Sequence, residues 1–126
     1  MRHSSLIIIA LEIKADGARR LARHRQLVCE HTADTIEASP ERALALGGVN
    51  IERSASSFAE AWRAILAVGS VTKICALLRD DTDDTEQMRI SQPFAGLLAP
   101  QELRAISREV YPIKDVKGDL RARLAE

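Results

Sequence analysis

Aromatic side chains are scarce in this sequence. Its 126 residues include one Trp, one Tyr and two Phe, and aromatic residues make up only 3% of the chain. Alanine, leucine, isoleucine and valine must therefore fill most of the core, within a hydrophobic fraction of 46% that is typical of a globular protein. The sequence also offers few rings on which nucleic-acid bases could stack.

The chain has no net charge, because its 18 basic residues balance its 18 acidic ones. Proteins that bind nucleic acids usually carry a basic excess, so this balance disfavours that class. The one dense basic stretch is Arg19–Arg25, where Arg19, Arg20 and Arg23 share a helix face. A nucleic-acid-binding regulator stays an alternative, and an ordinary solvated face is the simpler interpretation. A neutral surface also favours self-association, since copies repel each other little.

Cysteines and long apolar runs are also rare. Cys29 and Cys75 stand in apolar segments without a CxxC motif, which predicts buried, reduced thiols in a cytoplasmic protein. The run Leu6–Leu11 is too short to span a membrane, and no cleavage site follows it. We therefore expect a soluble cytoplasmic protein without a membrane-spanning segment.

The sequence lacks recognisable catalytic, cofactor-binding and metal-binding motifs. It has no G-x-S-x-G, H-E-x-x-H or glycine-rich phosphate loop, so whether the protein is an enzyme stays open. His24 and His31 lie two helical turns apart, and Lys14 separates Glu12 from Asp16. We expect neither a metal nor a cofactor.

Several segments have the 3.6-residue apolar period or the end signals of helices. The expected helices span Ala18–Ala38, Phe58–Val68 and the stretch from Pro100 to Pro112. Ser57-Phe-Ala-Glu60 has the pattern of a capping box for the second of these. Glycine favours caps and turns, so we expect elements to stop near Gly17, Gly47-Gly48 and Gly69.

Four other segments have the patterns of strands. β-Branched and alternating apolar residues suit a pleated surface, and the first segment contains three consecutive isoleucines. The expected strands are Ser5–Ile13, Val49–Arg53, Val71–Leu78 and Glu86–Ser91, the last two as a hairpin around the polar turn Asp80–Thr85. We predict a single-domain α+β protein over residues 1–126, with a small sheet backed by amphipathic helices. An all-α helical bundle is the alternative.

One loop has the composition of an anion-binding site. Arg53, Ser54, Ser56 and Ser57 lie between an expected strand and a helix start, where backbone amides and the helix dipole favour an anion. Arg53 adds a forked donor for phosphate or carboxylate. The simpler interpretation is that Ser57 caps the helix and Arg53 faces water. A small enzyme or ligand-binding protein for an anionic metabolite is therefore our second function hypothesis.

The leading hypothesis is a small binding or regulatory module that acts as a homo-oligomer. The chain is neutral, lacks a catalytic constellation and carries apolar segments towards both ends. In the amphipathic segment Asp115–Leu124, the stripe Val116, Leu120 and Leu124 needs a surface to bury itself, and a second copy can supply one.

Trp62 is the single tryptophan of the chain. It shares a helix face with Phe58 and Ile65, since these residues are spaced by four and three positions. With so few aromatic residues available, we expect Trp62 to contribute strongly to the core or to a subunit interface.

Overall fold

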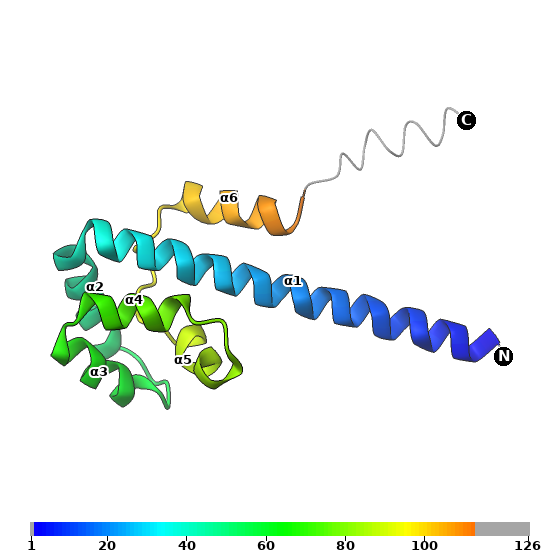
Figure 1. The fold of residues 1–126 in the computed structure, drawn as a ribbon, viewed down its shortest axis with the longest axis horizontal. Coiled ribbons are helices and arrows are strands. Elements are labelled where there is room, and N and C mark those ends of the chain that lie inside the picture. The colour runs from blue at the N-terminus through cyan, green and yellow to red at the C-terminus, as the bar shows by residue number, and fades with distance from the viewer. Residues whose placement is uncertain (1, 113–126) are drawn as a thin grey trace.

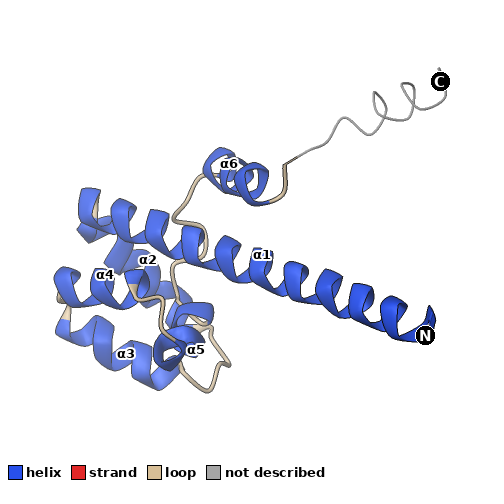
Figure 2. Cartoon of the chain, turned by 45° about the vertical axis from the view of Figure 1, so that its right-hand side comes forward, coloured by secondary structure: helices blue, strands red, loops and turns tan. Residues whose placement is uncertain are grey.

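The computed structural model describes residues 2–112, and this part of the chain is helical (Figure 1 and Figure 2). None of these residues lies in a strand. The prediction of an α+β fold with a small sheet is therefore wrong, and an all-α helical bundle fits instead. The elements are α1 (Arg2–Ala38), α2 (Pro40–Glu52), α3 (Ala59–Val68), α4 (Val71–Arg79), the short 3-10 helix η1 (Asp83–Thr85), α5 (Glu86–Ile90) and α6 (Pro100–Val110).

Each segment that we expected to be a strand contributes to a helix. Ser5–Ile13 lies inside α1, Val49–Arg53 covers the end of α2, Val71–Leu78 lies within α4 and Glu86–Ser91 contains α5. A strand needs a hydrogen-bonding neighbour, whereas a helix satisfies its backbone groups within one segment. The preference of isoleucine and valine for strands spans only ~1 kcal/mol and depends on context. In this chain the helical context outweighs it.

The glycines end helices less often than we expected. Gly17 lies inside α1, and Gly47 and Gly48 lie inside α2, so two of the three expected breaks are wrong. Gly69 does end α3, with a left-handed φ of 69° that favours glycine. Pro100 begins α6 as expected, and Pro40 begins α2.

The long helix α1 is the axis of the fold (Figure 1). Its 37 residues correspond to a length of about 55 Å at ~1.5 Å per residue. Helices α4, α2 and α5 pack against its C-terminal half, and α3 packs against α2. Helix α6 runs antiparallel to α1 on another side. The N-terminal half of α1 projects beyond these helices.

The core lies between the C-terminal half of α1 and helices α2 to α4, and the connection from α5 to α6 closes it. Trp62 is completely buried, and the Phe94 ring meets its indole edge-on with 6.0 Å between ring centroids. The remaining buried residues of this cluster are aliphatic or small: Cys29, Ala33, Ile36, Ala43, Ile51, Ala59, Ile74, Cys75, Leu78 and Leu97. The expectation of a mainly aliphatic core is thus confirmed.

Asn50 fixes the connection that carries Phe94. Its Nδ2 donates hydrogen bonds of 2.9 Å to the carbonyl oxygens of both Pro93 and Ala95. This holds Phe94 close to α2, where a Cβ added at Gly47 would lie 2.9 Å from Phe94 Cε1. Gly47 is therefore required by packing and not by a helix end.

Two adjacent glycines of α2 provide a matched test of this packing. Gly47→Ala should destabilise the protein, because overpacking a core typically costs about 1–3 kcal/mol. Gly48→Ala should stabilise it by about 0.5–1 kcal/mol, the usual gain from alanine in a helix, because its Cβ meets no atom within 4 Å. Urea denaturation monitored by circular dichroism gives both values. A stabilised Gly47→Ala variant would show that Phe94 does not lie against α2.

Candidate functional site

The projecting segment, which we define as residues 6–22 of α1, carries an unusual amount of exposed apolar surface. Six large side chains in it are between 50% and 67% exposed: Leu6, Ile7, Ile8, Ile9, Leu11 and Ile13. Successive helix residues point about 100° apart, so the four residues Leu6–Ile9 surround the helix on all sides. Exposed patches of this kind usually mark an interaction surface.

One face of the projecting segment continues the core stripe of α1. Ile7, Leu11, Ala18 and Ala22 are spaced by four and seven residues, and a further step of seven reaches Cys29. Cys29 is buried, and its Sγ lies 3.7 Å from the carbonyl oxygen of Arg89. The face of α1 that packs against α2, α4 and α5 therefore extends beyond these helices without a partner among the described residues, and Lys14, seven residues after Ile7, lies on it as well.

A hollow of about 230 Å³ lies at the base of the projecting segment. Ala22 and Ile90 contribute apolar groups to it, and Asp81, Asp83 and Glu86 contribute carboxylates. Ile90 is itself 44% exposed. The end of the projecting segment thus meets a hollow whose lining includes the guanidinium groups of Arg25 and Arg89 as well as these carboxylates.

Arg89 organises the acidic loop beside this hollow. Its guanidinium is buried and donates to the side-chain oxygen of Gln26 at 2.7 Å, to the Thr82 carbonyl at 2.7 Å and to Thr85 Oγ1 at 3.1 Å. We expected Asp80–Thr85 to be the polar turn of a strand hairpin, but this segment joins α4 to α5 and contains η1. Asp80 accepts the backbone N–H of Thr82, and this hydrogen bond lowers the pKa of the Asp80 carboxyl.

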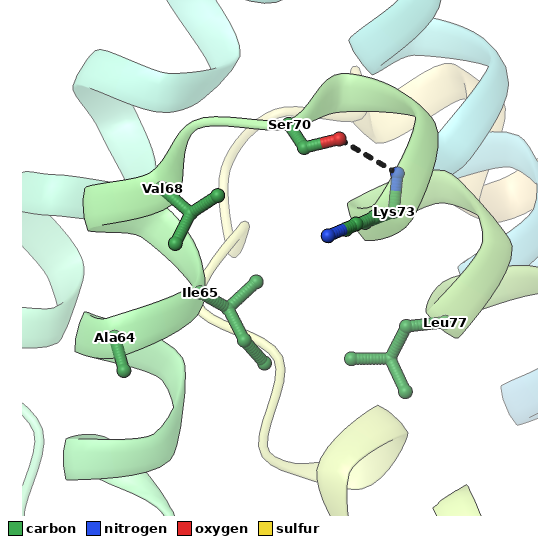
Figure 3. A pocket seen from close by; sticks show the side chains of 6 residues that line it. All are labelled: Ala64, Ile65, Val68, Ser70, Lys73 and Leu77. Carbon is green, nitrogen blue, oxygen red and sulfur yellow. Dashed lines mark hydrogen bonds between the residues drawn. The ribbon is translucent and has the colours of Figure 1, made fainter.

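A second apolar surface is a groove on the hairpin of α3 and α4, with a volume of about 360 Å³. Figure 3 shows the six side chains that line it: Ala64, Ile65, Val68, Ser70, Lys73 and Leu77. Ser70 caps α4, because its Oγ accepts the backbone N–H of Lys73 at 3.3 Å. Sequence reasoning missed this groove because it assigned α4 to a strand.

The predicted anion loop connects α2 to α3. Ser54 Oγ accepts the N–H of Ser56 at 3.2 Å, and Ser56 Oγ accepts the N–H of Phe58 at 3.1 Å. Ser57 does not cap α3, because Phe58 occupies the N-cap position without a side-chain hydrogen bond, so the capping-box prediction is wrong. Arg53 follows α2 directly and is exposed. Two of the three hydroxyls thus hold the loop itself, and an anion here stays a prediction.

The predicted basic patch is partly neutralised. Arg19 forms an ion pair with Asp16, and Arg23 lies 3.3 Å from Glu109 of α6. Arg20 is exposed on the same stretch of α1. Carboxylates next to arginines compete with phosphate groups, so this geometry adds no support for nucleic-acid binding.

The remaining chemically versatile side chains do not form a reactive cluster within residues 2–112. Burial raises the pKa of both the Cys29 and the Cys75 thiols, so neither is an activated thiolate. His24 is half-buried against α6, where its Nε2 lies 3.2 Å from Ser107 Oγ, whereas His31 is exposed. No three histidine, cysteine, aspartate or glutamate side chains of the described residues converge as metal ligands.

Comparisons with family models, curated proteins and solved structures found no match to this chain. Among the described residues, no helix combines the length and the apolar character needed to cross a membrane. The stripe Val116, Leu120 and Leu124 lies outside the described residues. Function must therefore be argued from the two apolar surfaces.

Proposed function

We propose that the protein is a helical binding module that forms a homodimer through the projecting segment of α1. The observation that carries this proposal is the exposure of large apolar side chains on residues 6–13, among them Ile7 at 60% and Leu11 at 61% on the face that continues the core. Burying an exposed leucine or isoleucine completely contributes about 1.5–3 kcal/mol, so this surface strongly favours a partner.

The distribution of side-chain sizes supports a second copy as that partner. On the face that continues the core, the large residues Ile7 and Leu11 lie near the free end, and the small residues Ala18 and Ala22 lie near the body. Antiparallel pairing about a two-fold axis places Ile7 opposite Ala22 and Leu11 opposite Ala18 in both halves of the interface. Large side chains then pack against small ones, as close-packed helix interfaces require.

The charged residues that flank this antiparallel interface, and the hollow at each of its ends, are consistent with antiparallel pairing. Glu12 and Arg19 are seven residues apart and share one flank of the helix, so antiparallel pairing brings Glu12 of one copy towards Arg19 of the other. The free end of one copy reaches Ala22 of the other, next to the hollow that contains Ile90. Parallel pairing would place large residues on large ones and leave this hollow unfilled.

In this proposal the dimer works in the cytoplasm. Cys29 and Cys75 are both free thiols. Free thiols in a protein persist most readily in a reducing compartment.

Sedimentation equilibrium across a concentration series tests the dimer. Leu11→Asp should yield a monomer with unchanged helicity, because it places a carboxylate at the centre of the paired face. Ile13→Asp is the matched control: Ile13 is 67% exposed and Leu11 61%, but Ile13 lies on another side of α1. This control should still dimerise. A wild-type monomer at high concentration, or equal loss in both variants, would contradict the proposal.

Cysteine cross-linking separates antiparallel from parallel pairing. In a background with Cys29 and Cys75 replaced by alanine, Ile7→Cys alone should not cross-link to itself in an antiparallel dimer. A mixture of Ile7→Cys and Ala22→Cys chains should form the mixed disulfide under mild oxidation. Self-linked Ile7→Cys as the main product would instead indicate parallel helices.

A further inference from the structure

The groove on the α3–α4 hairpin has the dimensions of a small-molecule site. Its volume of about 360 Å³ falls near the lower end of the range of ~300–1,000 Å³ for such sites. Ala64, Ile65 and Val68 line it from α3, and Leu77 lines it from α4 (Figure 3). Val68 is 71% exposed although it is a large apolar side chain. None of these residues belongs to α1, so the groove is separate from the proposed dimer interface.

A single charge lies at one end of this apolar groove. The amine of Lys73 extends into the space bordered by Ile65, Val68 and Leu77 (Figure 3). All four ion pairs in the described part of the chain involve arginine, so Lys73 has no carboxylate partner there. Ser70 Oγ accepts the Lys73 N–H, which leaves the Ser70 O–H able to donate to another group.

We propose that this groove binds an alkyl carboxylate. The alkyl chain lies along Ala64, Ile65, Val68 and Leu77, and the carboxylate accepts hydrogen bonds from Lys73 Nζ and Ser70 Oγ. An ammonium group that loses water on ligand binding needs a negative partner, and a carboxylate supplies it in a charge-assisted hydrogen bond.

Other ligand classes fit this lining less well. A cationic ligand would be repelled by Lys73, and a neutral one would cover the ammonium without pairing it. An extended peptide carries polar backbone groups along its whole length, whereas polar partners occur here only at Ser70 and Lys73. One negative head group and one apolar tail match the groove.

Titration with octanoate, followed by amide signals in two-dimensional NMR, tests the site. Octanoate should shift the signals of residues 64–77, and each added methylene group should strengthen binding by up to about fourfold. Octanol and octylamine, which share the alkyl chain, should bind more weakly. Unmoved signals in this range, or equal binding of octylamine, would overturn the proposal.

Substitutions in the groove test which residue binds the carboxylate head group and which residue contacts the alkyl tail. Lys73→Gln should weaken octanoate binding by at least about tenfold, the loss expected for one hydrogen bond to a charged group, and should leave octanol binding unchanged. Lys14→Gln makes the same change on α1 and should have no effect. Val68→Asp should abolish binding because it places a like charge in the groove. Wild-type affinity in Lys73→Gln would show that Lys73 does not hold the carboxylate.

Discussion

Trp62→Ala is expected to lower the free energy of unfolding by about 3–5 kcal/mol, the range for removing a buried aromatic side chain. The side chain is completely buried, and its Nε1 donates a 3.0 Å hydrogen bond to the carbonyl oxygen of Met88. The indole thus joins α3 to α5 and packs against Phe94. Alanine leaves a cavity and removes the indole donor, so the Met88 carbonyl keeps only the 3.2 Å hydrogen bond from Ser91 Oγ. A loss of this size is a large part of the stability of a small protein.

Urea denaturation monitored by circular dichroism measures this effect, since the substitution removes the only tryptophan. Trp62→Phe keeps most of the volume but loses the N–H donor, so its cost should be smaller than that of alanine. Val68→Ala, on the exposed side of the same helix, should change stability by less than about 0.5 kcal/mol. Native Trp62 emission should be blue-shifted. A stable Trp62→Ala variant with unchanged helicity would mean that Trp62 does not pack in this core.

The helices with regular apolar spacing could be read from the sequence. The segments expected over 18–38, 58–68 and from Pro100 each form a helix in the structure. In these segments the apolar stripe and the propensities agree, although the expected break at Gly17 and the capping box at Ser57 were wrong. Trp62 is buried as its spacing with Phe58 and Ile65 indicates. Local sequence was sufficient where several independent signals pointed to the same element.

The strand prediction for the N-terminal segment Ser5–Ile13 was wrong because the local preference of this segment conflicts with that of the residues that follow it. Three isoleucines favour a strand, but the following residues form a strong helix, and extending an existing helix costs far less than starting one. Gly17 opposes this by only about 0.5–1 kcal/mol, the usual cost of glycine inside a helix. The steps of four and seven residues from Ile7 to Cys29 were the signal that favoured a continuous helix.

The two candidate surfaces depend on tertiary structure and were harder to predict. Lys73 and Ile65 come together only because Gly69 and Ser70 fold α3 and α4 into a hairpin. Leu11 is exposed because the helices that pack against α1 reach only as far as the region of Arg23. No local sequence pattern indicates where that packing ends. Homo-oligomerisation was proposed from apolar segments in general, and the structure now supplies a specific face on which to test it.

Arg89→Met should be the second strongly destabilising substitution, with an expected loss of at least about 1.5–3 kcal/mol, the value of a hydrogen bond to a charged group. The guanidinium binds Gln26, Thr82 and Thr85 from a buried position and so attaches the acidic loop to α1. Methionine fills part of the space but leaves the Thr82 carbonyl without this donor. The spacing of charges in the sequence did not reveal this role, because none of the three partners is acidic.

Arg79→Met is the matched control for this prediction. Arg79 pairs with Asp34 at 2.7 Å and also with Glu37, whose carboxyl pKa is lowered by the Arg79 hydrogen bond. All three side chains are substantially exposed, and exposed ion pairs typically contribute less than about 1 kcal/mol. Added salt should weaken the Arg79 pairs but leave the cost of Arg89→Met nearly unchanged, since screening acts mainly on exposed charges. A larger loss for Arg79→Met than for Arg89→Met in urea denaturation would contradict this ranking.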